Sequence, residues 1–263
     1  MSEPLSYHLF GIDFGANEGQ RELIRLIRLD PNKMPVVYCL GSAGTGKTFA
    51  SLAAALSLVR SKGSLKKYKT IYYVREPVEV GHRLGYLKGS EEEKYAPYLG
   101  PLLDNYQHLM DHCKNETKTP QNPPKAMKMS SSSEEALPYA YRKLPSDIVP
   151  LAPEFLRGRS FEDCIILVDE AQNMNLDEFQ TLTTRIGRNC KLVFMGSVNQ
   201  IDVPDQSEEN NDFLTSYRIL EPTGLVGFVR LQEPMRSGFV AEFDERFVAY
   251  RRAKLSPKTP KDK

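Results

Sequence analysis

The sequence predicts an α/β fold: a mainly parallel sheet covered by helices on both faces. Four short apolar runs rich in β-branched and aromatic residues are typical of buried strands, at residues 36–40, 70–74, 164–168 and 191–195. Helical patterns fall between or after these runs. Because parallel strands need long crossover connections, which are usually helices, this alternation favours a parallel sheet.

Further elements follow from periodicity. An amphipathic run at residues 21–29 and an Ala- and Leu-rich segment at residues 47–59 predict two helices. A fifth strand is expected at residues 227–231 and a last helix at about residues 238–252.

Another helix is predicted at residues 176–186. Asn175 precedes it, and Glu178 stands three positions later, which is the pattern of a capping box. Gly187 follows at the position where helices commonly end.

The chain is expected to form one domain over residues 1–253. Residues 114–135 contain three prolines and a serine run without apolar periodicity, which predicts a mobile insertion. The acidic, amide-rich residues 205–212 predict a surface loop, and the lysine-rich residues 254–263 a disordered tail.

Composition narrows the class of protein. The 263 residues carry 35 Lys and Arg against 34 Asp and Glu, a net charge of +1, so overall charge gives no attraction to nucleic acid. No apolar run approaches the roughly 20 residues that cross a bilayer, and the first residues lack a secretory signal pattern. The four cysteines lie far apart, which argues against a zinc site or a disulfide framework. A cytoplasmic protein without a membrane partner is expected.

The strongest motif is an eight-residue glycine-rich loop between the first strand and its helix. It fits the P-loop (Walker A) pattern G-x-x-x-x-G-K-[ST], whose backbone N–H groups surround the phosphates of a nucleotide at a helix N-terminus. Its Lys would contact the β- and γ-phosphates, and its Thr hydroxyl would coordinate Mg²⁺. The loop consists of Gly41, Ser42, Ala43, Gly44, Thr45, Gly46, Lys47 and Thr48.

An acidic pair ends the strand at residues 164–168. There, Asp169 would hold Mg²⁺ through water, and Glu170 would polarise an attacking water molecule. A kinase excludes water and needs no such base, so the pair favours hydrolysis. The alternative is that Glu170 is a surface acid at the end of a strand.

Two glutamines have two interpretations each. Gln200 follows the strand at residues 191–195 and could contact the γ-phosphate, or it could belong to a polar turn. Gln20 could pair with adenine through its amide, or it could complete a capping box with Asn17 at the start of the helix.

The motifs together resemble the PhoH-like ATPases, which are related to the core of superfamily 1 helicases. The family has GPAGTGKT, RPxVExGExLGFLPG, PYLRPLYD, RGRTLNDAFIILDEAQN and FLTRIGFGSKMVVTGDxxQID. This chain has GSAGTGKT, REPVEVGHRLGYLKG, PYLGPLLD, LRGRSFEDCIILVDEAQN and LTTRIGRNCKLVFMGSVNQID. The resemblance covers roughly residues 17–250.

The resemblance implies a single RecA-like P-loop domain that binds ATP and Mg²⁺. It carries over the roles already given to Lys47, Thr48, Asp169, Glu170 and Gln200. The sequence QEPMRSGFV is similar to the family's EDVVRSGLV and implies that Arg236 is a γ-phosphate sensor or arginine finger. One departure is Ser197, since the family usually has Asp there and Ser supplies no negative charge.

The resemblance also implies a ring-shaped homo-oligomer, for which a hexamer fits, and action on RNA or single-stranded nucleic acid in a bacterial or phage-infected cytoplasm. Arg75, Arg157 and Arg159 lie in the shared blocks, and their guanidinium groups suit phosphate of nucleotide or nucleic acid equally. The main alternative, motivated by Ser197, is a nucleotide-dependent assembly module with negligible turnover. A phosphotransferase is a weaker third interpretation, which the DEAQN sequence counts against.

Overall fold

The computed structural model describes residues 6–61, 68–75, 91–116, 138–156, 158–197, 211–233, 235, 242–243, 246–247 and 249–250. Its centre is a six-stranded sheet in the order β5-β4-β6-β7-β3-β8, and every neighbouring pair is parallel. The strands are β3 (Val36–Gly41), β4 (Thr70–Arg75), β5 (Ile148–Leu151), β6 (Cys164–Asp169), β7 (Cys190–Gly196) and β8 (Val226–Leu231).

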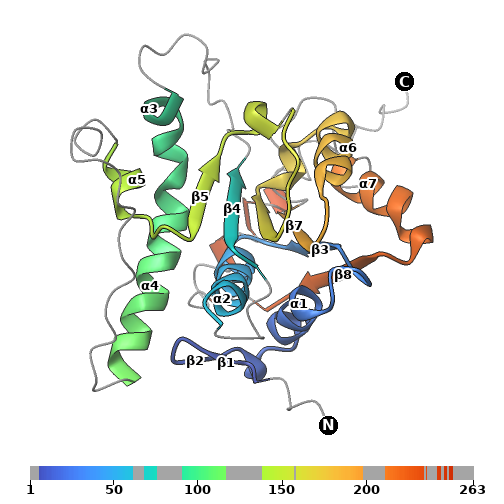
Figure 1. Cartoon of the computed structure of the whole chain (residues 1–263). Coiled ribbons are helices and arrows are strands. Elements are labelled where there is room, and N and C mark those ends of the chain that lie inside the picture. Colours follow the sequence, from blue (N-terminus) through green and yellow to red (C-terminus); the bar gives the residue numbers. More distant parts are fainter. Residues whose placement is uncertain are drawn as a thin grey trace, which may run out of the picture.

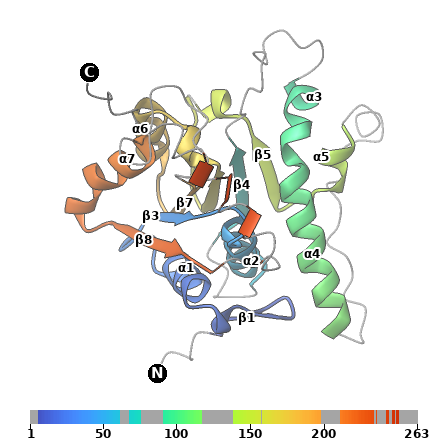
Figure 2. The same ribbon diagram turned by 180° about the vertical axis from the view of Figure 1, so that it is seen from behind.

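Helices cover both faces of this sheet, so the predicted fold class is confirmed (Figure 1). Along β3, Val37 and Cys39 join the core beneath α1 (Glu18–Arg28) and α2 (Lys47–Val59), whereas Tyr38 and Leu40 join the core beneath α6 (Leu176–Arg185) and α7 (Asp212–Leu220). The view from behind shows the same layers (Figure 2). The helices are α1 (Glu18–Arg28), α2 (Lys47–Val59), α3 (Glu91–Tyr95), α4 (Gly100–Glu116), α5 (Tyr139–Lys143), α6 (Leu176–Arg185) and α7 (Asp212–Leu220).

All five strands expected from the sequence are present. The sixth, β5, escaped prediction because it has only four residues and contains Pro150, which lacks a ladder donor and suits a strand at the sheet edge. A short antiparallel pair, β1 (His8–Leu9) and β2 (Ile12–Asp13), precedes α1 and was also not predicted.

The helix boundaries revise three expectations. The capping box of Asn175 and Glu178 is present, and α6 ends at Arg185. Residues 114–116 form the last turn of α4, while the rest of the expected insertion lies outside the described residues. At the end of the expected acidic loop, the Asn211 side chain accepts a hydrogen bond from Phe213 N–H and caps α7.

Most of the expected last helix and all of the expected tail lie outside the described residues. None of the helices that are described is long and apolar enough to cross a bilayer.

Candidate functional site

The candidate site lies at the carboxyl edge of the sheet. Because the strands are parallel, the residues that end β3, β4, β6 and β7 meet there. The glycine-rich loop follows β3, Asp169 ends β6, and Arg75 ends β4 directly opposite Asp169 in the register. Ser197 comes immediately after β7. The fold therefore gathers the phosphate loop and the acidic pair at one edge.

Tight backbone packing shapes the phosphate loop. A Cβ atom added to Gly41 would lie 2.7 Å from Thr45 Oγ1 and 2.9 Å from the Leu231 carbonyl oxygen, so only glycine fits. Gly46 has a φ of +84° and is the N-cap of α2. It has no side chain to cap the helix, so the first N–H groups of α2 face the loop, an arrangement that suits an anion.

Replacing Gly46 by Ala is expected to damage both the loop and phosphate binding. The new Cβ would meet Gln20 Nε2 at 2.5 Å, in addition to the cost of about 1 kcal/mol for a left-handed backbone. Gly224→Ala is the matched control, because Gly224 has a φ of +69° and nothing within 4 Å. Thermal unfolding with and without Mg·ATP should show a larger loss for Gly46→Ala and no stabilisation by nucleotide. Equal behaviour of the two variants would contradict this account of the loop.

The Lys47 ammonium is held at the mouth of the loop. Its Nζ donates hydrogen bonds to the carbonyl oxygens of Gly41, at 2.7 Å, and Ser42, at 3.0 Å. Burial lowers the pKa of Lys47 below its ordinary value, and the negative charges of Asp169 and Glu170 oppose that shift. Among the described residues, the hydrogen-bond partners of this partly desolvated cation are carbonyl oxygens, so it is suited to contact phosphate oxygens.

Thr48 and Asp169 form the part of the site that fits Mg²⁺. Thr48 Oγ1 donates to Asp169 Oδ1 at 3.0 Å. Hydroxyl and carboxylate oxygens are the hard donors that Mg²⁺ prefers, and Mg²⁺ usually completes its shell with water and substrate phosphates. Within the part of the chain that is described, no group of three or more His, Cys, Asp or Glu side chains could hold a metal ion. The Thr48 hydroxyl and the Asp169 carboxylate fit a Mg²⁺ ion whose other ligands are water and phosphate oxygens.

Two donors engage the other oxygen of Asp169. Tyr73 Oη donates to Oδ2 at 2.7 Å, and Arg75 Nη1 donates to the same atom at 3.0 Å. Burial raises the pKa of Tyr73 well above its ordinary value, and Asp169 adds to the shift, so the hydroxyl keeps its proton and remains a donor. Burial alone would lower the pKa of Arg75, but Asp169 and other neighbours outweigh it, and the pKa is raised.

Glu170 has an unusual backbone and two side-chain contacts. Its φ of +55° and ψ of +34° are left-handed, which costs about 1 kcal/mol for a residue with a Cβ. Gln172 Nε2 donates to Oε2 at 2.7 Å, and Arg75 Nη2 donates to Oε1 at 3.3 Å. The strained turn from β6 into the 3₁₀ helix Ala171–Asn173 thus fixes where the carboxylate lies.

Gln172 connects Glu170 to the end of β7. Its Oε1 accepts a hydrogen bond from Ser197 N–H at 2.9 Å, and its carbonyl oxygen accepts from Asn211 Nδ2 at 3.1 Å. A Cβ on Gly196 would lie 3.0 Å from two ring carbons of Phe213 and 3.2 Å from Gln172 Oε1, so a side chain before Ser197 would crowd both residues. The Ser197 hydroxyl is buried and has no hydrogen-bond partner among the described residues.

Gln20 is buried beside the phosphate loop. The Asn17 side chain caps α1 by accepting from Gln20 N–H at 2.9 Å, while Gln20 Nε2 donates to the Thr45 carbonyl oxygen at 3.1 Å. Asn17 thus caps α1, but the Gln20 amide bonds to the phosphate loop, so the expectation that Gln20 completes a capping box was wrong. Its part in reading adenine stays a prediction.

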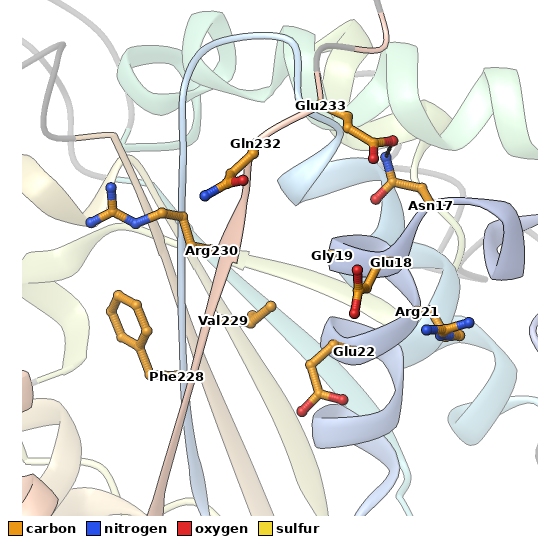
Figure 3. A pocket seen from close by; sticks show the side chains of 10 residues that line it. All are labelled: Asn17, Glu18, Gly19, Arg21, Glu22, Phe228, Val229, Arg230, Gln232 and Glu233. Atoms are coloured by element: carbon orange, nitrogen blue, oxygen red, sulfur yellow. Dashed lines mark hydrogen bonds between the residues drawn. The ribbon is translucent and has the colours of Figure 1, made fainter.

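A pocket of about 420 Å³ lies next to this glutamine, between α1 and β8. Gly19 permits the close approach of the two elements, because a Cβ there would lie 3.3 Å from the Arg230 carbonyl oxygen. Figure 3 shows the side chains of Phe228 and Arg230 on the strand side and Glu22 on the helix side. At one end, Asn17 Nδ2 donates to Glu233 Oε2 at 2.9 Å.

Beyond the pocket, the chain that follows β8 contacts the phosphate loop: Met235 N–H, two residues after the lining residue Glu233, donates to the Gly44 carbonyl oxygen at 2.8 Å.

The described part of the chain holds most of the residues that the sequence singled out. Gln200, Arg236 and Arg157 lie outside it. Two residues of the acidic site were missed by sequence reasoning. Tyr73 looked like a core residue of a strand, and Gln172 stood in the DEAQN motif without an assigned role.

Comparison with known proteins places the chain in a family. A family model described as PhoH-like protein matches residues 14–247. Protein PhoH2 of Bacillus subtilis (strain 168) is 34% identical over 231 residues, covering 88% of this chain and 46% of that protein. Protein PhoH of Escherichia coli (strain K12) is 27% identical over 219 residues, covering 81% of this chain and 52% of that protein. The chain spans about half the length of these relatives.

Among solved structures, the large terminase from a thermophilic bacteriophage is similar, with a TM-score of 0.50 and 10% sequence identity. The similarity covers 88% of this chain and 50% of the terminase, and at this identity it supports the fold alone. The family model, however, spans nearly the whole chain, including the phosphate loop and the acidic pair. The chain belongs to the PhoH-like protein family.

Proposed function

We propose that this chain binds ATP with Mg²⁺ and hydrolyses the β–γ phosphoanhydride bond with water. The main observation behind this proposal is that the phosphate loop contacts the acidic pair: Thr48 Oγ1 donates a hydrogen bond to Asp169 Oδ1 at 3.0 Å. Nucleotide binding is what the family's P-loop implies, and a base beside the metal site favours hydrolysis over transfer to another substrate.

Each residue contributes one step. The loop N–H groups and Lys47 bind the β- and γ-phosphates, and Thr48 and Asp169 hold the metal ion, which when bound neutralises charge on the phosphate oxygens. Glu170 orients the attacking water and accepts its proton. Gln200 and Arg236 are proposed to contact the γ-phosphate, and Arg236 would stabilise its transition-state charge from the same subunit or a neighbour.

The nucleoside is proposed to lie in the pocket between α1 and β8. The chain that lines one end of the pocket reaches the phosphate loop two residues later, through Met235 N–H and the Gly44 carbonyl oxygen. The pocket volume of about 420 Å³ falls in the usual range for small-molecule sites. Gln20 lies on α1 between the lining residues Gly19 and Arg21, with its amide bonded to the phosphate loop, and it is proposed to contact the base. Asn17 and Glu233, which close one end, would then lie near the sugar or base.

Homo-oligomer formation and action on RNA or single-stranded nucleic acid complete the proposal. The resemblance noted in the sequence supports both partners.

The deciding experiment is steady-state ATP hydrolysis by purified protein with Mg²⁺, with the metal chelated, and with added single-stranded RNA or DNA. Turnover that needs Mg²⁺ is expected, and stimulation by one polymer would identify the partner. Tight ATP binding without turnover under every condition would contradict hydrolysis. It would favour an assembly module, for which the uncharged, buried Ser197 is the motivating observation.

A further inference from the structure

One guanidinium group bridges the two acids of the site. Arg75 Nη1 contacts Asp169 Oδ2 at 3.0 Å, and Arg75 Nη2 contacts Glu170 Oε1 at 3.3 Å. The planar fork of arginine makes this double contact with a single side chain, which the point charge of a lysine does not reproduce. Arg75 therefore lies between the metal ligand and the base of the proposed reaction.

The two contacts differ in strength. The Asp169 side chain is only 6% exposed, and Tyr73 donates to the same oxygen as Arg75, so this contact is buried and supported. The Glu170 side chain is 29% exposed, and its contact with Arg75 is longer than an ordinary charge-assisted hydrogen bond. Because water screens partly exposed pairs, the contact with Glu170 is the easier one to break.

Hydrogen bonds to neighbouring residues hold the backbone of Arg75 and one oxygen of Glu170 in place. Arg75 N–H donates to Tyr95 Oη at 2.8 Å, and Tyr95 Oη donates to the Arg75 carbonyl oxygen at 3.2 Å, so the end of β4 is fixed on the buried Tyr95. The other oxygen of Glu170 is held by Gln172 at 2.7 Å. Of the contacts that Glu170 makes here, the one between its Oε1 and the Arg75 side chain is therefore the one that can break.

We propose that Arg75 is a brake on hydrolysis, a positioning residue that holds Glu170 away from the attacking water through the Nη2–Oε1 contact. Breaking this contact frees Oε1 to accept the proton of water, while the contact with Asp169 stays and keeps the site assembled. The inference rests on the proposed function, because Glu170 must be the base. In this proposal, the rate of hydrolysis depends on Arg75 in addition to the P-loop and the acidic pair.

Arg75→Lys tests the brake. Its ammonium can still pair with Asp169 but cannot reach Glu170 at the same time, so kcat without polymer should rise about two- to fivefold, the effect of losing one partly exposed ion pair. KM for ATP and the melting temperature should change little. Arg60→Lys is the matched control, because Arg60 also makes two contacts through its guanidinium group, both with the carboxylate of Asp147, at 2.6 and 3.2 Å, outside the site. Its kcat should equal that of the wild type.

A second set of variants guards against a merely structural effect. Arg75→Gln keeps an amide near Asp169 and removes the charge, so it should also raise kcat, with a lower melting temperature. The double variant Arg75→Lys/Glu170→Gln should be as inactive as Glu170→Gln alone, since the gain must pass through Glu170. Its affinity for Mg·ATP, measured by titration calorimetry, should lie within about threefold of that of Glu170→Gln, because the contact with Asp169 is retained.

The possible results distinguish the proposed inhibitory role of Arg75 from the proposed ATP hydrolysis. Higher kcat in Arg75→Lys, lost in the double variant, supports the brake. Unchanged or lower kcat in an active, folded Arg75→Lys overturns it, as does a raised KM at constant kcat, which would make Arg75 an ATP-binding group. If both the wild type and Arg75→Lys bind ATP without turnover, hydrolysis and the brake fail together, and turnover by Arg75→Lys alone supports both.

Discussion

Glu170→Gln is expected to reduce kcat for ATP hydrolysis by about 10²- to 10⁴-fold, the usual contribution of a general base. The amide has the shape of the carboxylate but cannot accept the proton of the attacking water. It does not touch Lys47 or Thr48 in the structure, so Mg·ATP should still bind. The effect should therefore appear in kcat under single-turnover and steady-state conditions, with nucleotide affinity nearly unchanged.

The control for this substitution is Glu162→Gln, because the Glu162 side chain is 62% exposed and lies before β6, at the opposite end of the strand from Glu170. It should retain wild-type kcat. Hydrolysis that survives Glu170→Gln at more than about one tenth of the wild-type rate would remove Glu170 from the role of base.

The acidic pair shows how far sequence reasoning reaches. Asp169 and Glu170 were identifiable because an apolar strand runs directly into two acids, and the strand order then brings that strand's end to the phosphate loop. The left-handed backbone of Glu170 could not be predicted, since it depends on the turn into a 3₁₀ helix. Its contacts with Gln172 and Arg75 join residues from different elements, so they could not be predicted from the residues next to Glu170 in the sequence.

The strands show the same limit. Those that are buried on both faces, such as β3 and β7, appear as continuous apolar runs and were predicted. The edge strand β5 and the hydrophilic helix α4 are stabilised by packing against their neighbours more than by their own composition. Tyr73 was not identified as a site residue for a related reason: a strand pattern predicts a buried ring and says nothing about the hydroxyl, which donates to Asp169.

The position of Gln20 illustrates a third case, in which two interpretations were open. The helix cap and the amide contact turn out to use different atoms of the same short segment, with Asn17 capping α1 and Gln20 bonding to the phosphate loop. Spacing along one helix turn does not distinguish a side chain that turns back to its own helix from one that reaches a neighbouring loop. That choice depends on how α1 packs beside β3 and β8.

Lys47→Ala is expected to weaken Mg·ATP binding by about a hundredfold or more and to abolish hydrolysis. The ammonium would make charge-assisted hydrogen bonds to phosphate oxygens, each of which is worth about 1.5–3 kcal/mol. Titration with a non-hydrolysable ATP analogue measures the affinity directly. Lys69→Ala is the control, because Lys69 pairs with Asp163 and is 75% exposed, so its loss removes the same charge outside the site.

Stability distinguishes loss of binding from loss of fold in this variant. Burial lowers the pKa of Lys47, which means that the folded chain holds this charge at a cost. Removing it should leave the melting temperature without nucleotide close to that of the wild type, while the rise produced by Mg·ATP disappears. A wild-type affinity in a folded Lys47→Ala protein would show that the loop does not bind phosphate through this side chain. A chain that unfolds without Lys47 would assign the residue a structural role in place of a binding one.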